Sequence, residues 1–500
     1  MLKRFLCLLT VLLLLPAACF AQEFVMAGFD GQDSAKDWAA NDFFTRMQER
    51  TGVGFTFQEY TDAAKWQAAK DAMFAQGGQL PDVLFKAALT SEELIRYTDS
   101  GQLIDLLPLL PENAPNLWAL LQENPDWLAA ITLPNGKVGA LPMIQTLSTQ
   151  NAMWINQAWL EELHLDKPTD MESLAKVLRA FKERDPNQNG KEDEKPFLFI
   201  GPWELKFFSH AYGVVVNDYN LYLDDAGQVH YWPLEDSFAA FLTDMRALFA
   251  EGLLDPDGFI TADSMRLITD EKATITYGAF FAPTPLYLLP LDHCQNYVAL
   301  EPLTAADGTQ VYRDLNGQIC RGTFAITSAC ADPAALLRWV DILYTEEGAI
   351  EAMVGKEGDC WSYAADGTWN WHSDNETTYR ISSGEISITD TGEMPLLFPK
   401  AFNASFGDKA VTHVTSQCDV LTPYLRMAFP YYTLTAEQRA QVRPLQQELG
   451  SYVDIAIANF VLGETPINDQ TLAQFREGLN QLGAAEMTAF WQSIADSLHP

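Results

Sequence analysis

The chain has 500 residues, of which 67 are Asp or Glu and 32 are Lys or Arg, so its formal net charge is −35. A surface this acidic repels nucleic acid and anionic lipid headgroups. It also disfavours an acidic polymer such as a polyuronate as the ligand, unless a local basic pocket overrides the overall charge. A chain of this length exceeds a single hydrophobic core and predicts two domains.

The first 21 residues have the pattern of a signal peptide for export. Lys3 and Arg4 precede the apolar run 5–15, which is too short to span a membrane. Cleavage after Ala21 would release a soluble protein, whereas Cys19 offers the alternative of a lipid anchor. We therefore expect an exported, extracytoplasmic protein at the cell surface or in the periplasm, and both forms remain open.

From residue 24 onward, short apolar runs alternate with segments of helical spacing. The runs 24–29, 54–60 and 82–85 predict strands, and the segments 37–50 and 63–75 predict helices. This alternation predicts an α/β fold with a parallel sheet that helices cover on both faces. In such sheets, ligands bind beyond the carboxyl ends of the strands.

Three polar residues stand at the carboxyl ends of these predicted strands. They are Asp30, Tyr60 and Lys86. Their positions predict that they lie near a ligand cleft. For each of them the alternative is an ordinary solvated loop residue.

The same alternation continues to the end of the chain. The further predicted strands are 138–141, 152–156, 196–200, 274–281 and 325–327, with a polar stretch at 145–150 between the first two. The further predicted helices are 157–163, 171–183, 234–251, 333–344 and an almost entirely helical tail from 435, broken at 463–469 and 483.

The segment 185–196, between a predicted helix and a predicted strand, has the ligand alternation of an EF-hand calcium loop. The candidate ligands are the side chains of Asp185, Asn187, Asn189, Asp193 and Glu194 and the backbone carbonyl of Lys191. Pro196 stands where an EF-hand has a bidentate Glu, so Glu194, water or distant groups would complete the shell. The alternative is a plain Asn-Gly turn without a metal. Calcium in this loop would be structural.

The cysteines beyond the signal segment are sparse. They are Cys294, Cys320, Cys330, Cys360 and Cys418, with no CxxC pair among them. This spacing argues against a zinc site. Export permits a disulfide, but the sequence does not determine a pairing, and buried free thiols remain an open alternative.

Seven short motifs, in a fixed order, resemble those of the extracellular solute-binding proteins of ABC transporters, in particular the carbohydrate-binding, lipoprotein-like group with a calcium loop. The motifs are 80–84 (LPDVL), 136–142 (GKVGALP), 153–160 (MWINQAWL), 185–196 (DPNQNGKEDEKP), 248–256 (LFAEGLLDP), 344–348 (YTEEG) and 459–463 (NFVLG). Each match is weak alone, but their common order spans most of residues 24–495.

The resemblance implies a type II periplasmic-binding-protein-like fold, in which hinge strands join two α/β lobes and the ligand binds between them. Mapped onto this chain, lobe one is about 22–143 plus 296–355, and lobe two is about 147–292 plus most of 372–500. The hinge crossings would be 140–145 and 289–298. In calcium-binding relatives the metal sits in lobe two, away from the sugar. The resemblance further implies a monomer that delivers a small solute to an ABC permease.

Aromatic rings pack on the C–H faces of sugars, so they are the main candidates for contacts with such a ligand. Trp203 follows a predicted strand, Tyr277 and Phe280 lie in another, and Trp361 follows a loop that often carries an aromatic residue in the family. Gln145 would hydrogen-bond a hydroxyl from a hinge strand. Relatives frequently have Trp where this chain has Phe280, and burial is the alternative for every ring.

The sequence favours a binding protein over an enzyme. An exported glycoside hydrolase, the main rival, needs two carboxylates that face one sugar bond. The nearest candidates are Asp292 beside His293, and Glu357 near Asp359, and no signature supports either. A nucleophile elbow, an HExxH motif and a phosphate-binding glycine loop are all absent from the sequence. A third possibility is a sugar sensor that serves a membrane receptor.

Overall fold

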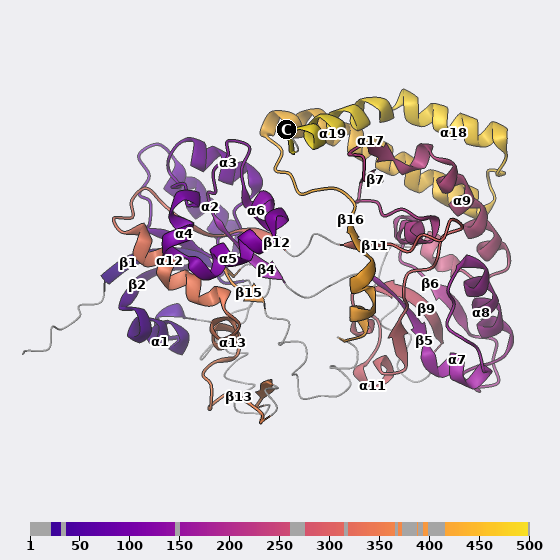
Figure 1. Cartoon of the computed structure of the whole chain (residues 1–500), viewed down its shortest axis with the longest axis horizontal. Helices are drawn as coiled ribbons and strands as arrows, with labels where there is room; N and C mark the ends of the chain where they lie inside the picture. Colours follow the sequence, from indigo (N-terminus) through magenta and orange to yellow (C-terminus); the bar gives the residue numbers. More distant parts are fainter. Residues whose placement is uncertain are drawn as a thin grey trace, which may run out of the picture.

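The computed structural model describes residues 22–31, 37–145, 151–260, 276–314, 319–365, 369–372, 388, 394–398 and 416–498. The expected signal segment with Cys19 and most of the polar stretch 145–150 lie outside these ranges. The described residues form two lobes, each with its own sheet (Figure 1). This arrangement confirms the predicted two-lobe α/β fold.

The lobe-one sheet has six strands in the order β15-β4-β12-β3-β1-β2. Strand β1 pairs in parallel with β2 and β3, whereas β12 runs antiparallel to β3 and β4. The strands are β1 (Gln22–Phe29), β2 (Val53–Tyr60), β3 (Val83–Phe85), β4 (Leu141–Gln145), β12 (Ile319–Ile326) and β15 (Leu397–Phe398). The helices of this lobe are α1 (Asp42–Thr51), α2 (Ala63–Phe74), α3 (Ser91–Asp99), α4 (Leu110–Asn113), α5 (Pro115–Glu123), α6 (Pro125–Ile131), α12 (Pro333–Asp341) and α13 (Glu346–Val354).

The helix predicted at 37–50 is two elements, the 3₁₀ turn η1 (Trp38–Ala40) and helix α1. Asn41 separates them because its backbone is extended (φ −78°, ψ 126°) and its side chain caps the second helix, accepting a bond from the Phe43 N–H at 2.8 Å. A second difference concerns the strand predicted at 138–141. The strand begins only at Leu141 and continues to Gln145.

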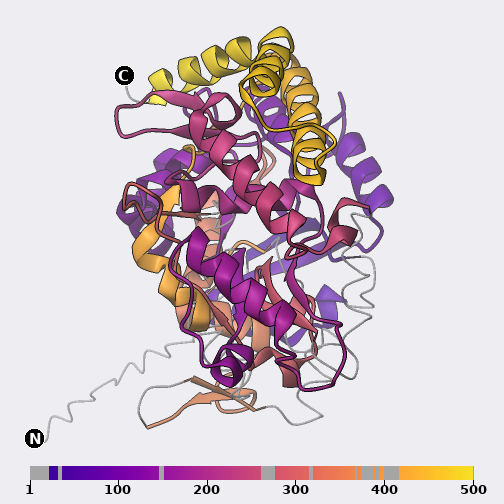
Figure 2. The same cartoon turned by 90° about the vertical axis from the view of Figure 1, so that its right-hand side faces the viewer.

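The lobe-two sheet has four strands in the order β10-β5-β9-β6, with β6 and β9 parallel. The strands are β5 (Ala152–Asn156), β6 (Lys195–Leu198), β9 (Tyr277–Ala282) and β10 (Tyr297–Ala299). The helices are α7 (Gln157–Leu163), α8 (Met171–Glu183), α9 (Asp236–Ala250), α11 (Leu291–Cys294), α17 (Ala436–Leu462), α18 (Asp469–Gln481) and α19 (Ala484–Leu498), with the 3₁₀ segment η3 (Pro202–Tyr212). The three C-terminal helices lie at the top of this lobe in Figure 2 and share its largest core with α9.

The chain passes between the lobes at other places than the family mapping suggested. Strand β10 pairs with β5, so the expected crossing at 289–298 lies inside lobe two. The chain crosses into lobe one only after β11 (Tyr312–Asp314), which pairs with β16 (Leu425–Met427). Strand β15, expected in lobe two, pairs with β4 in the lobe-one sheet. Strand pairing joins segments that are far apart in the sequence, and short motifs do not reveal such pairing.

Smaller elements complete the described part of the chain. They are β7 (Leu221–Leu223), β8 (Val229–Tyr231), β13 (Trp361–Tyr363), β14 (Trp369–Trp371), and the 3₁₀ turns η2 (Leu107–Leu109), η4 (Trp232–Leu234), η5 (Pro256–Phe259), η6 (Pro285–Tyr287), η7 (Ile342–Tyr344) and η8 (Cys418–Tyr424). All five cysteines beyond the signal segment are described, and none of them forms a disulfide with another of the five. Among the described helices, none has an apolar stretch of the length that a bilayer crossing requires.

Candidate functional site

Two predicted site residues of lobe one, Asp30 and Lys86, form a buried ion pair across the carboxyl ends of β1 and β3. Asp30 is 0% exposed and Lys86 is 1% exposed, so neither presents its charge to solvent. Lys86 adopts a left-handed backbone conformation (φ 50°), which is uncommon for a residue with a Cβ. In this structure the pair holds together the strand ends that face lobe two.

Gln145 is the last residue of β4 and pairs with Phe398 of β15 at the same edge of the lobe-one sheet. Its Oε1 is buried without a hydrogen-bond partner among the described residues. An unpaired buried acceptor is costly, and a ligand hydroxyl would satisfy it. Gln145 therefore stays a candidate on the lobe-one side.

Three of the predicted aromatic residues are core residues in this structure. Tyr277 and Phe280 are at most 1% exposed and pack under the lobe-two sheet, with Tyr297 against both. Trp361 is 0% exposed, and its indole N–H donates to the Gly355 carbonyl at 2.7 Å. None of these rings offers a face to a solute, so we leave all three out of the site proposed below. Strand β9 is buried on both faces, and residues of α13 cover Trp361, which a sequence pattern does not reveal.

Trp203 differs from the other aromatic candidates because 41% of it is exposed. It lies in η3, just after β6, and its ring packs edge-to-face on Phe207 at 5.9 Å between centroids. The neighbouring Glu204 is buried and accepts a hydrogen bond from the Ile200 N–H at 2.6 Å, which fixes the turn that carries Trp203. Burial raises the pKa of Glu204 to about 8, so this carboxyl is protonated at neutral pH.

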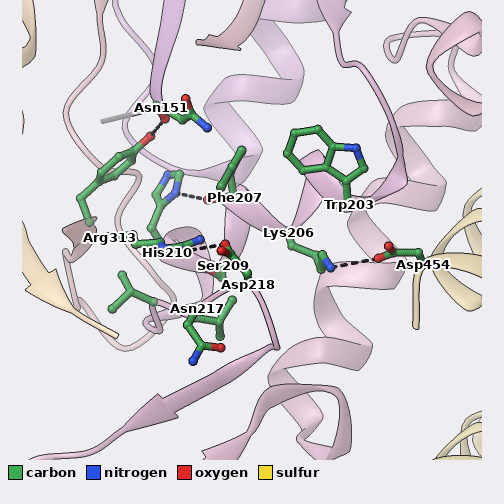
Figure 3. Close-up of a pocket in the computed structure, with 13 residues that line it drawn as sticks. Asn151, Trp203, Lys206, Phe207, Ser209, His210, Asn217, Asp218, Arg313 and Asp454 are labelled. Atoms are coloured by element: carbon green, nitrogen blue, oxygen red, sulfur yellow. Dashed lines mark hydrogen bonds and ion pairs between the residues drawn. The ribbon is translucent and has the colours of Figure 1, made fainter. Parts of the chain in front are cut away.

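Trp203 borders a cavity of about 410 Å³, the Trp203 pocket (Figure 3). Its lining residues are Asn151, Trp203, Lys206, Phe207, Ser209, His210, Val215, Val216, Asn217, Asp218, Tyr312, Arg313 and Asp454. Asn151 directly precedes β5, whose first residue Ala152 pairs with Ala282 at the end of β9. The pocket thus lies at the carboxyl edge of the parallel strands β6 and β9, where ligands of α/β sheets bind.

The two cationic side chains of this pocket are matched by carboxylates. Lys206 Nζ lies 2.9 Å from Asp454 Oδ1, and Arg313 Nη2 lies 2.8 Å from Asp218 Oδ1 (Figure 3). These pairs leave the pocket without excess charge. Polar atoms in a neutral setting around aromatic rings suit a hydroxyl-rich, uncharged ligand.

His210 adds an unused hydrogen-bond acceptor to the pocket. Its Nδ1 lies 2.7 Å from the Phe207 carbonyl, so Nδ1 carries the proton and donates. Burial lowers the pKa of His210 to about 4, which keeps the ring neutral. Nε2 is buried without a partner among the described residues and has a lone pair for a hydroxyl donor.

The sequence indicated Trp203 but none of the other pocket residues. Lys206 and Asp454 are 248 positions apart, and the pocket exists only because α17 packs against η3 in the folded lobe. The useful signal was the position of Trp203 just after a strand, followed by further aromatic residues. Periodicity does not show that Tyr312 and Arg313 return to the same edge on β11.

The predicted calcium loop joins α8 to β6, at the opposite end of β6 from Trp203. The Gly190 N–H donates to Asp185 Oδ2 at 2.9 Å, and the Asn189 amide donates to Asp193 Oδ1 at 2.9 Å. Glu194 Oε1 is buried without a partner among the described residues. Burial, and then the charges of Asp193 and Asp185, raise the pKa of Glu194.

These features test whether the loop fits a cation. In the described ranges, no group of three or more His, Cys, Asp or Glu side chains is arranged to hold a metal ion. Calcium also uses amide and backbone oxygens, which the loop supplies, and the unpartnered Glu194 oxygen beside two further carboxylates suits a hard cation. The residues present therefore fit calcium better than a transition metal.

No sequence model of a protein family matches the chain. Over 340 residues the chain is 28% identical to the fructooligosaccharide ABC transporter substrate-binding protein FusA of Streptococcus pneumoniae serotype 4. This alignment covers 65% of the chain and 62% of FusA, so the chain matches about three-fifths of the length of this curated relative.

Solved structures match over nearly the full chain. FusA in complex with kestose has a TM-score of 0.67 at 22% identity, with 95% of this chain and 99% of FusA covered. An HMO-binding, ABC-transporter-associated solute-binding protein from Bifidobacterium longum infantis has a TM-score of 0.75 at 20% identity, with 95% of this chain and 98% of that protein covered. Alginate-binding protein AlgQ2, solved without calcium ion, has a TM-score of 0.63 at 18% identity, with 96% and 99% covered. One FusA structure is of an EF-hand mutant. At these identities the likeness establishes a shared fold.

The chain thus has the two-lobe fold of solute-binding proteins, and its relatives in sequence and structure are sugar-binding proteins of ABC transporters.

Proposed function

We propose that this protein is the extracytoplasmic solute-binding component of an ABC importer and that it captures an oligosaccharide between its lobes. The observation that carries the proposal is the Trp203 pocket, where an exposed ring stands beside charge-balanced polar groups at the ligand edge of lobe two. The ring would pack on the C–H face of a sugar. His210 Nε2 and Asn151 would bind its hydroxyls.

The same geometry supports binding without bond cleavage. A glycoside hydrolase needs two carboxyl groups that are free to act on one sugar bond. The two carboxylates of the Trp203 pocket, Asp218 and Asp454, are instead held by Arg313 and Lys206. The sequence candidates Asp292 and Glu357 do not line this pocket.

Delivery to a permease requires that a ligand favour one arrangement of the lobes. A sugar that contacts lobe two at Trp203 and lobe one at Gln145 would bind the closed arrangement better than the open one. Closure then presents both lobes to a membrane permease, the proposed partner. The relatives belong to ABC transporters, which supports this assignment.

The test is a titration of the mature protein with neutral oligosaccharides, among them fructooligosaccharides such as kestose, together with acidic oligosaccharides and peptides. Calorimetry and a thermal shift should both report binding of at least one oligosaccharide, and chromatography should recover it intact. Recovery of cleaved sugar would show an enzyme, and binding of peptides alone would remove sugar as the solute class.

A matched pair of variants then locates the site. Trp203→Ala should weaken binding roughly thirtyfold, because about 2 kcal/mol of ring burial is lost. Tyr363→Ala removes a ring of similar exposure, 44% against 41%, from lobe one and should leave binding unchanged. Equal effects of the two variants would place the site elsewhere.

We also propose that the loop 185–194 binds a structural calcium ion. The ligands would be Asp185, Asn187, Asn189, Asp193, Glu194 and the carbonyl of Lys191. The existence of a FusA EF-hand mutant points to a similar loop in that relative. Calcium would hold the loop between α8 and β6 in one conformation and would take no part in sugar binding.

Calcium at a hundred times its dissociation constant should raise stability by about 2.7 kcal/mol, measured as a rise in melting temperature that a chelator reverses. Asp185→Asn with Asp193→Asn should abolish the rise, whereas Asp166→Asn, in an exposed loop, should not. An identical response of both variants would contradict the assignment.

Export is the last part of the proposal and rests on the pattern of residues 1–21. The mass of the protein isolated from its native cells distinguishes the two forms. A chain that starts at Gln22 indicates soluble release, and a lipid on Cys19 indicates anchoring. An intact residue 1 would contradict both forms.

A further inference from the structure

A second cavity, of about 530 Å³, lies where the two lobes meet. Lobe one contributes Ser91, the first residue of α3, and Arg321 of β12. Lobe two contributes Tyr219, Trp491 and several residues between 431 and 446, among them Arg439 and Arg443. We name this cavity the arginine pocket.

The arginine pocket concentrates positive charge in an acidic protein. The chain has 67 acidic and 32 basic residues, yet this lining contains three arginines and no Asp or Glu. In the described part of the chain, Arg321 contacts the Thr433 hydroxyl and lies 4.9 Å from the Tyr431 ring centroid, and none of the three arginines has an ion pair. Their charges are therefore available to a ligand.

Buried donors without partners line the same cavity. Arg439 Nη2, Trp491 Nε1 and Gln446 Nε2 are each buried and lack a hydrogen-bond partner among the described residues. Trp491 is only 7% exposed and Gln446 only 8%. Arginine and indole nitrogens can only donate, and leaving such donors unpaired in the interior is unfavourable. A ligand with acceptor oxygens would pair these donors and is therefore the chemistry that fits the cavity.

Backbone geometry brings the arginine of lobe one to this position. Gly322, next to Arg321, has φ 75°, and a Cβ there would lie 2.3 Å from the Leu89 carbonyl oxygen. Only glycine permits this close approach of β12 to the segment before α3. The approach places Arg321 beside Ser91, at the edge of lobe one that faces lobe two.

The arginine pocket adjoins the Trp203 pocket. Asn217 and Asp218 line one cavity, and the next residue, Tyr219, lines the other with 42% of its surface exposed. One extended ligand can therefore contact both cavities across this turn. The tyrosine rings around the arginines suit a sugar ring better than a free inorganic ion.

We propose that the ligand is an acidic oligosaccharide and that the arginine pocket binds its anionic group, which is a carboxylate, a sulfate ester or a phosphate ester. This inference rests on the proposed function. Guanidinium groups match these oxyanions geometrically. Arg321 from lobe one and Arg439 from lobe two would contact the same group, so its binding favours closure. Such a local basic site reverses the expectation, drawn from net charge, that acidic polymers are poor ligands.

The test compares saccharides that differ only in charge. The mature protein is titrated by calorimetry with neutral galacto-oligosaccharides and with their uronate, sulfated and phosphorylated counterparts, and separately with inorganic sulfate. One acidic class should bind about tenfold to hundredfold more tightly than its neutral counterpart, because charged hydrogen bonds are gained. The preference should shrink as the salt concentration rises.

Variants assign the preference to the cavity. Arg439→Gln should remove most of the preference for the acidic saccharide, and Arg443→Gln, which removes a second positive charge from the lining, should reduce it. Binding of the neutral saccharide at the Trp203 pocket should stay unchanged in both variants. Arg179→Gln removes the same charge from a surface pair with Glu251 and should preserve the preference. Unchanged melting temperatures would show that the variants fold.

Three results would overturn the inference. The first is that a neutral saccharide binds as tightly as every charged counterpart, which would contradict the inference but leave the proposed sugar-binding function standing. The second is that the preference for the acidic saccharide persists in both arginine variants. The third is that inorganic sulfate binds as tightly as any saccharide. If no saccharide of either kind binds, the proposed function fails together with this inference.

Discussion

The two cavities differ in how their cationic side chains are matched by carboxylates. In the Trp203 pocket, Lys206 and Arg313 each contact an aspartate within 3 Å, at 2.9 and 2.8 Å. In the arginine pocket, no carboxylate lines the described cavity, and Arg439 carries a buried nitrogen without a partner. Paired charges act as neutral polar groups toward a ligand, whereas unpaired charges select an anion.

This difference also separates structural charges from ligand-binding charges. Asp30 and Lys86 were candidates for the ligand site, yet both are buried and bind each other. Their role in this structure is to join β1 to β3. A charged residue at the carboxyl edge of a strand is therefore informative about ligands only once its partner is known.

The largest expected effect is on stability, at the paired charges. Lys86→Met leaves Asp30 buried without its cation, and unfolding free energy should fall by about 3–5 kcal/mol. Urea denaturation followed by tryptophan fluorescence measures the change. Arg443→Gln, at an unpaired and exposed arginine, should stay within about 0.5 kcal/mol of the natural protein. Similar losses of stability in both variants would contradict the distinction between paired structural charges and unpaired ligand-binding charges.

The next effect is on binding, at the unpaired charges. Arg439→Glu combined with Arg443→Glu should weaken binding of the acidic saccharide about a hundredfold, because two attractive contacts become repulsive. Calorimetry should show less than about a threefold change for a neutral saccharide, since a difference of that size is under 1 kcal/mol. A parallel loss for both ligands would mean that the arginines shape the lobes and do not select charge.

A pH-dependent effect on stability concerns the turn that carries Trp203. The folded protein holds a proton on Glu204 up to a pKa of about 8, against an ordinary value of 4.5. Its contribution to stability is therefore full below pH 4.5 and is lost as the pH rises through 8. The melting temperature should fall between these pH values, and less steeply in Glu204→Gln, which keeps an acceptor for the Ile200 N–H. Identical slopes for both proteins would contradict the assignment.

The smallest effect measures one charge pair of the Trp203 pocket. Lys206 and Asp454 are 12% and 35% exposed, so a double-mutant cycle with alanine should give a coupling of only about 0.5–1 kcal/mol. Thermal unfolding of the four proteins provides the cycle. Binding of a neutral saccharide should also be insensitive to salt, in contrast to the acidic one. A strong dependence of the neutral saccharide's affinity on salt concentration would contradict the assignment of balanced charge to this pocket.

Local sequence signals predicted many of the elements that build the site. The strand 152–156 and the helices 157–163 and 171–183 lie where periodicity places them, and the tail is broken at Gly463 and Gly483 as expected. Hydrophobic spacing and turn chemistry act over a few residues, which is why these predictions hold. The position of Trp203 after β6 followed from the same reasoning.

The lobe boundaries and the burial of aromatic residues depended on distant contacts. Tyr277, Phe280 and Trp361 had the right residue type for a sugar platform, but packing from other elements covers them. Strand β10 belongs to lobe two because it pairs with β5, more than a hundred positions earlier in the chain. No local pattern distinguishes a ring that faces solvent from one that a second layer covers.

The α/β class, the alternation of strands and helices, and the oxygen spacing of the loop 185–194 follow from the sequence alone, because each depends on residues that are neighbours in the chain. The tertiary structure decided which charges are paired. Lys206 meets Asp454 and Arg321 approaches the Tyr431 ring only after separate segments pack together. Ligand selectivity rests on that pairing, since net charge describes the whole surface whereas a ligand contacts only the few side chains that the fold brings to one cavity.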